Sequence, residues 1–152
     1  MSAEDNLKKM NIQLPEPPSP VGSYVASKIS GNLIYISGQI PFKSDGKLII
    51  GKVGRELNLE EAQNAAKLCA LNLLAQLKKA CDGNLDKVKG CTKITGYVNS
   101  VDNFTEQPKV INGASDLISK VFGEIGKHTR AAVSVNSLPL GVPVEVDAIF
   151  EI

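Results

Sequence analysis

Two residues in the last quarter of the chain carry the side chains best suited to binding a small anionic ligand. Arg130 begins one segment of alternating apolar and polar residues, and Glu145 lies in a second such segment. The planar guanidinium of arginine can hold a carboxylate through two parallel charge-assisted hydrogen bonds. A positioned carboxylate such as Glu145 can orient or deprotonate a water molecule. The pair therefore indicates a site for a small anion.

Residues 130–152 are predicted to form a hairpin that exposes these two residues on one face of a sheet. The apolar members of the alternation are Ala131, Val133 and Val135 in the first arm, and Val144, Val146, Ala148 and Phe150 in the second. Successive side chains of a strand point to opposite faces of a sheet. One face can therefore be buried under helices while the other carries Arg130, Ser134 and Glu145.

Both candidates also have a structural interpretation. Arg130 could form an ion pair with Asp147 or Glu151 across the hairpin, and Glu145 could be a strand residue that faces solvent. A turn within residues 138–141 would pair Glu145 near Ser134 rather than opposite Arg130. The two side chains are then several residues apart in one chain, and a cleft between subunits would be needed to bring both to one ligand.

Length, charge and composition narrow the class of protein. The 152 residues fit one domain, predicted over 21–152 after an N-terminal lead-in over 1–20. A net charge of +1, with 17 basic and 16 acidic residues, disfavours nucleic acid as a partner. The N-terminus lacks the apolar segment of a signal peptide, and no run is long enough to span a membrane. A soluble cytoplasmic protein is expected.

Few residues offer metal or nucleophile chemistry. The single histidine, His128, is expected to be exposed in the loop before Arg130, and the three cysteines are expected to be reduced thiols. These residues supply no recognisable metal-ligand set, so no metal is expected. Ser37 has no histidine or carboxylate at the spacing of a catalytic triad, so a nucleophilic role is disfavoured.

The periodicities predict an α+β domain. Strands within 23–30 and 32–40 are joined by a tight turn at Gly31 and Asn32. A weaker strand or loop follows over 47–53. Asn58 and Glu61 predict a capping box that starts a helix ending near Gly83. A strand over 88–98, a helix over 108–125 and the closing hairpin complete a two-layer domain, in which one mixed sheet carries two helices on one face.

The second face of the predicted sheet is too mixed to be simply solvated. It carries Tyr35, Tyr97 and Ile149 among polar residues, and such a face is expected to be covered by copies of the chain itself. A closed homo-oligomer with sites at the subunit junctions is predicted.

Several of these segments together resemble the Rid family, also called the YjgF or L-PSP family, whose fold is similar to that of the trimeric chorismate mutases. The likeness covers Pro17 to Ile152 and is closest to the longer branch labelled as endoribonucleases. It rests on VGSYVAS, GNLIYISGQIP, the helix from Glu60, DNFTEQPKVINGASDLISKVFGE, Arg130 and LPLGVPVEVDAIF. The combination at this spacing is specific, whereas any one segment alone is weak.

This resemblance implies a homotrimer with three clefts between subunits and no cofactor. RidA-branch members hydrolyse enamines and imines, such as 2-aminoacrylate, to 2-oxo acids and ammonia. The residues carried over to the site are Tyr24, Ser37, Asn112, Arg130 and Glu145. Tyr24 could equally be a packed strand tyrosine, and Asn112 a helix-surface amide. The RidA branch often has a cysteine where this chain has Ala132, so a pocket of different polarity and size is expected.

Three functions follow from these observations. The first is an enamine or imine deaminase. The second is a trimer that binds a 2-oxo acid or similar metabolite without catalysis. The third is an endoribonuclease, as the family label suggests, although near-neutral charge and few aromatic residues give little support to an RNA-binding surface.

Overall fold

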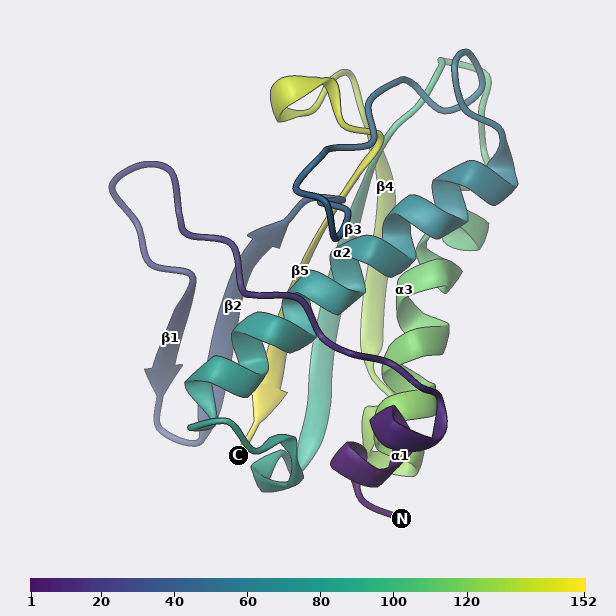
Figure 1. Cartoon of the computed structure of the whole chain (residues 1–152). Coiled ribbons are helices and arrows are strands. Elements are labelled where there is room, and N and C mark those ends of the chain that lie inside the picture. The colour runs from purple at the N-terminus through teal and green to yellow at the C-terminus, as the bar shows by residue number, and fades with distance from the viewer.

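A mixed five-stranded sheet carries the long helices on one face (Figure 1). The computed structural model describes all residues from Met1 to Ile152. Short 3-10 turns lie at Leu85–Lys87, Gly123–Gly126 and Pro139–Gly141. The helices and strands are α1 (Ala3–Lys9), β1 (Ser27–Ser30), β2 (Leu33–Gln39), α2 (Leu59–Ala80), β3 (Gly90–Asn99), α3 (Gln107–Phe122), β4 (Thr129–Val135) and β5 (Val144–Glu151). The α+β class predicted from the sequence is confirmed.

The strand order is β1-β2-β5-β3-β4, so the predicted C-terminal hairpin is wrong. β3 lies between β4 and β5, pairing with β4 in parallel and with β5 in antiparallel orientation. The physical reason is the helix between β3 and β4. A strand, a crossover helix and a second strand form a unit whose strands are parallel neighbours. β5 then crosses back to fill the central position between β2 and β3.

Arg130 and Glu145 consequently lie on opposite faces of the sheet, which corrects the prediction that they share one. Arg130 pairs with Ile94, whose side chain is fully buried under the helices. Glu145 pairs with Tyr97 on the face that carries no helix. Ser134 pairs with the buried Val98 and so shares the face of Arg130. We call the helix-free face of the sheet the open face.

The turn and helix-start signals in the sequence are confirmed. β1 and β2 form an antiparallel hairpin in which Ser30 pairs with Leu33, and Gly31 adopts the positive φ of +61° that the turn requires. Asn58 and Glu61 form the predicted capping box at the start of α2. Residues 47–53 make only isolated bridges, such as Val53 with Ser100, so this segment is a loop rather than an edge strand.

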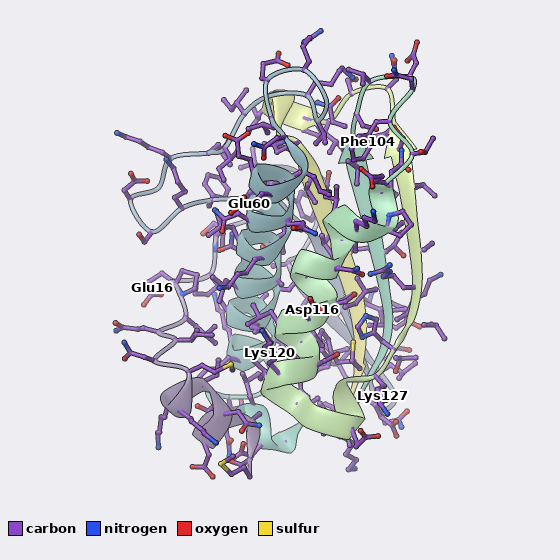
Figure 2. All side chains as sticks on the ribbon, turned by 90° about the vertical axis from the view of Figure 1, so that its right-hand side faces the viewer. Glu16, Glu60, Phe104, Asp116, Lys120 and Lys127 are labelled. Atoms are coloured by element: carbon purple, nitrogen blue, oxygen red, sulfur yellow. The ribbon has the colours of Figure 1, made fainter.

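The two long helices pack directly on each other and on the sheet. α2 and α3 lie side by side (Figure 2), and the buried face of each contributes to one hydrophobic core of 30 residues. Gly113 of α3 faces the backbone of Gln63 in α2, where a methyl group would collide with the carbonyl oxygen. The missing side chain therefore lets α3 approach α2 closely, which fixes the position of the α3 residues that face β4.

The N-terminal segment packs against the same core. Ala3 and Leu7 of α1 belong to the buried cluster. The extended chain after α1 crosses α2 (Figure 1), where buried Gln76 donates a hydrogen bond of 2.6 Å to the carbonyl of Pro18. None of the helices is long and apolar enough to cross a membrane.

We expect Gly113→Ala to destabilise the protein, although alanine favours helix. An exposed glycine-to-alanine change stabilises a helix by roughly 0.5–1 kcal/mol, but overpacking a tight contact costs about 1–3 kcal/mol. Urea denaturation would measure the free energy of unfolding. Asp116→Ala on the outward face of the same helix (Figure 2) should change it by less than about 0.5 kcal/mol. A Gly113→Ala variant as stable as the wild type would contradict the close approach.

Candidate functional site

A cavity of about 540 Å³ lies beside β2 and β5 and contains part of the predicted site. Tyr24, Gly38 and Glu145 line it. The remaining wall is mainly apolar and comes from loops far apart in sequence: Pro18, Pro20, Val21, Ala26, Ile40, Phe42, Pro139 and Leu140. A mostly apolar cavity with a few convergent polar groups is the usual form of a small-molecule site.

The position of the Glu145 carboxylate depends on the glycine next to Ser37. A methyl group added to Gly38 would collide with Oε1 of Glu145. The register of β2 and β5 also shifts between Ile36 and Gln39, which marks an irregularity at this point of the strand pair. The glycine in the SGQ segment therefore provides the space that the glutamate carboxylate occupies.

Glu145 is half-buried and has the electrostatics of a proton acceptor. Burial raises the pKa of its carboxyl group above the usual 4.5, and the nearby Asp147 carboxylate raises it further. No side chain or backbone group of the chain donates a hydrogen bond to it. Asp147 is engaged differently, because it accepts a hydrogen bond of 3.3 Å from the Tyr97 hydroxyl. Glu145 is thus the free carboxylate of the pair and can exchange protons with a ligand or a water molecule.

The two other residues predicted near this cavity have different surroundings. The Ser37 hydroxyl donates a hydrogen bond of 2.6 Å to the carbonyl of Val25, so it joins the segment before β1 to β2. Tyr24 is 53% exposed, and its ring lies against Gly22 and the cavity rather than in the core. Tyr24 can close the cavity with its ring, whereas the Ser37 proton is already used.

Arg130 and Asn112 meet on the other side of the sheet, at the junction of β4 and α3. Nη1 of Arg130 donates to Oδ1 of Asn112 at 2.8 Å and to Oγ of Ser115 at 3.1 Å. Nη2 donates to the carbonyl of Pro108 at 3.2 Å. The ion pair with Asp147 or Glu151, which was the alternative interpretation of Arg130, is not formed, because those carboxylates lie on the open face. The helix α3 holds the guanidinium through neutral acceptors.

Two residues of this network were not predicted from the sequence. Ser115 lies one helical turn after Asn112, so both face β4. His128 is half-buried rather than exposed, and its two ring nitrogens contact Oγ of Ser115 at 2.9 Å and the carbonyl of Gly126 at 2.7 Å. The i, i+3 spacing from Asn112 was the available signal for Ser115.

The predicted site residues therefore form two groups that one chain does not bring together. The first is the cavity with Tyr24 and Glu145. The second is the cluster of Asn112, Ser115, His128 and Arg130, which we call the arginine cluster. Glu145 and Arg130 lie on opposite faces of the sheet, and their strands β5 and β4 are separated by β3.

Comparisons with known proteins identify the family. The sequence model of the family described as "YjgF/chorismate mutase-like, putative endoribonuclease" matches residues 4–150. The chain belongs to this family. The resemblance to Rid proteins that the sequence segments indicated is thereby confirmed.

Individual relatives of this Rid-family chain are similar over nearly its whole length. Protein TCP17 of Trypanosoma cruzi is 45% identical over 148 residues, which cover 97% of this chain and 92% of TCP17. The crystal structure of Atu1372 from Agrobacterium tumefaciens, a protein of unknown function, superposes with a TM-score of 0.91 at 50% identity. It covers 99% of this chain and 92% of Atu1372. The rat 2-iminobutanoate/2-iminopropanoate deaminase is 28% identical over 139 residues, 91% of this chain and 86% of the rat protein.

We expect Glu145→Gln to stabilise the folded protein near pH 8. A carboxyl group whose pKa is higher in the folded than in the unfolded state binds more protons when folded. The contribution of Glu145 to the stability of the folded protein therefore falls as the pH rises above 4.5, the usual pKa of a glutamate. Thermal denaturation should give a higher Tm for the variant near pH 8 and no difference near pH 4, where the wild-type group is protonated.

Glu60→Gln is the matched control, because Glu60 lies exposed in the first turn of α2 (Figure 2), where its charge favours the helix. It should not raise the Tm near pH 8. An equal gain in both variants would show that general charge reduction, rather than the surroundings of Glu145, is responsible.

Proposed function

We propose that this Rid-family protein is an enamine and imine deaminase that hydrolyses reactive 2-imino and 2-enamino acids to 2-oxo acids and ammonia. Arg130 binds the substrate carboxylate, and Glu145 acts on water. Tyr24 and Asn112 contribute to binding. The name of the rat relative supports the reaction class, since that protein is a 2-iminobutanoate/2-iminopropanoate deaminase.

The hydrogen bonding of Arg130 is the observation that carries this proposal. Nη1 donates twice and Nη2 donates once to acceptors of α3. Nε has no acceptor in the chain, and Nη2 has two hydrogens but only one acceptor. These two donors lie on one edge of the guanidinium, the same edge that Arg55 uses to hold both oxygens of Glu56. The free edge of Arg130 therefore suits a carboxylate bound through two parallel hydrogen bonds.

Glu145 supplies the acid-base step. The carboxylate takes a proton from a water molecule as the water oxygen adds to the imine carbon, and a proton passes to the imine nitrogen. The resulting carbinolamine loses ammonia, and the carbon–oxygen double bond of the 2-oxo acid forms. An enamine first becomes the imine by gaining a proton at its β-carbon and losing one from its nitrogen. The raised pKa of Glu145 makes it a stronger base than an ordinary carboxylate.

We propose that the protein is a homotrimer with clefts between its subunits, and that a second copy of the chain completes the site. Glu145 and Arg130 face away from each other in one chain. β4 is an edge strand, and Tyr35 and Val133 on the open face are 45% and 46% exposed. Unpaired strand edges and apolar sheet faces are surfaces that another chain commonly covers. The cavity of one subunit and the arginine cluster of its neighbour would then form one site.

The test of Arg130 is a coupled assay in which an amino-acid oxidase or dehydratase generates the imine and 2-oxo acid formation is followed. Wild-type protein should accelerate formation over a reaction without it. A hydrogen bond to a charged group contributes about 1.5–3 kcal/mol, so loss of two in Arg130→Ala should raise KM roughly 10²-fold or more. Arg130→Lys keeps the positive charge but cannot form two parallel hydrogen bonds to a carboxylate, so its KM should also be raised.

The outcomes of this assay separate the alternatives. Binding of a 2-oxo acid by wild type without any turnover would favour the non-catalytic binding trimer. Cleavage of RNA that is lost in Arg130→Ala would favour the endoribonuclease. A variant that no longer folds, judged by circular dichroism, would give Arg130 a structural role instead.

Glu145→Gln should lower kcat by about 10²–10⁴-fold, because that is the usual contribution of a positioned general base. The wild-type enzyme should lose activity on acidification while the pH is still above 4.5, because the pKa of Glu145 is raised. The pH profile of kcat/KM measures this. If the residual kcat/KM of Glu145→Gln fell at acidic pH in the same way as that of the wild type, the proton transfer would be assigned to another group.

A further inference from the structure

A continuous chain of hydrogen bonds runs from a backbone carbonyl to the proposed carboxylate-binding arginine. The carbonyl of Gly126 contacts Nδ1 of His128 at 2.7 Å, and Nε2 of His128 contacts Oγ of Ser115 at 2.9 Å. Oγ of Ser115 in turn accepts from Nη1 of Arg130 at 3.1 Å. Every link is within hydrogen-bonding distance, and the residues come from α3, the segment that leads into β4, and β4 itself.

When the His128 ring is neutral, the direction of each bond in this chain is fixed by its ends. A carbonyl oxygen only accepts, so Nδ1 of His128 carries the ring hydrogen. In the neutral ring Nε2 is then an acceptor, and the Ser115 hydroxyl must donate to it. Arg130 only donates, so the remaining lone pairs of Ser115 point to Nη1. The tautomer of His128 thereby sets the orientation of the Ser115 hydroxyl. That orientation leaves the lone pairs of Oγ free to accept from Nη1 of Arg130.

The arginine cluster holds its guanidinium without neutralising it. The three acceptors are an amide oxygen, a hydroxyl oxygen and a backbone carbonyl, all uncharged. No carboxylate lies within ion-pair distance of Arg130, whereas Arg55 is paired with Glu56. An acidic partner would occupy the guanidinium and compete with an anionic ligand. The neutral cluster orients the side chain and leaves its charge for the ligand.

We propose that Ser115 and His128 are positioning residues for Arg130, which keep its Nε and Nη2 edge turned toward the ligand carboxylate. They act through Arg130 and do not touch the substrate. The Ser115 hydroxyl is engaged within the cluster, because it contacts Nε2 of His128 and accepts from Nη1 of Arg130. This assignment rests on the proposed function, since it presumes that Arg130 binds a carboxylate.

The first measurement examines the positioning itself in the absence of ligand. In ¹⁵N-resolved NMR spectra of the wild-type protein, His128 should show a protonated Nδ1 and an unprotonated Nε2. Two hydrogen bonds to Nη1 should slow rotation of the Arg130 guanidinium, giving separate Nη1 and Nη2 signals. Ser115→Ala should shift the Nε2 resonance and merge the Arg130 signals.

The second measurement examines ligand binding with 2-oxobutanoate, titrated by calorimetry. Ser115→Ala and His128→Phe should each weaken binding by roughly five- to tenfold, the effect of losing one hydrogen bond. The double variant should be no weaker than the weaker single variant, because both residues act through one chain of bonds. His128→Gln, whose amide oxygen can accept from Ser115, should retain most of the affinity. In turnover the loss should appear in KM rather than in kcat.

Ser119→Ala is the matched control, since Ser119 is exposed one turn further along α3 and its hydroxyl makes no hydrogen bond in the chain. Unchanged Arg130 signals and unchanged affinity in Ser115→Ala, with normal binding by wild type, would overturn the positioning role and leave the proposed function standing. Wild-type protein that binds no 2-oxo acid at all would overturn both, even if the Arg130 signals depend on Ser115.

Discussion

The C-terminal strand occupies the centre of the sheet, and its alternating burial constrains the rest of the molecule. Val144, Val146, Ala148 and Phe150 all lie in the core beneath the helices. β5 pairs with β2 on one side and β3 on the other, so it holds together strands from both halves of the chain. The same alternation forces Glu145 and Asp147 onto the open face. The catalytic carboxylate that we propose is thus positioned by the packing of the residues on either side of it.

The two charged groups of the candidate site are left without ionic partners, for different physical reasons. Glu145 is half-buried beside Asp147, which raises its pKa and costs stability near neutral pH. Arg130 is held by uncharged acceptors on α3. An ion pair between these groups within one chain is prevented by the sheet itself, since the residues face opposite sides. In the homotrimer that we propose, a ligand with its own carboxylate and electrophilic carbon uses both groups where two chains meet.

Sequence patterns predicted the burial and secondary structure of individual residues correctly, but they did not predict which strands are neighbours in the sheet. The alternation in residues 144–150 correctly separated the buried residues from those on the open face, and the capping box at Asn58 located the start of α2. The error lay in pairing β4 with β5, two strands adjacent in sequence. The helix between residues 99 and 129 was the sign that β3 and β4 are parallel neighbours. Placing β3 between the two strands also changed the face of Arg130, because register decides which side of the sheet a residue faces.

The sequence alone determined the α+β class, the family, the two long helices and the identity of the main candidate residues, because these depend on local periodicity and on residue types at fixed spacing. Only the tertiary structure decided the strand order, the cavity formed by four distant segments, and the contact of His128 with Ser115. These features depend on the packing of elements far apart in the chain. The close approach at Gly113 and the space left by Gly38 show the physical reason, since each is set by atoms that no local pattern brings together.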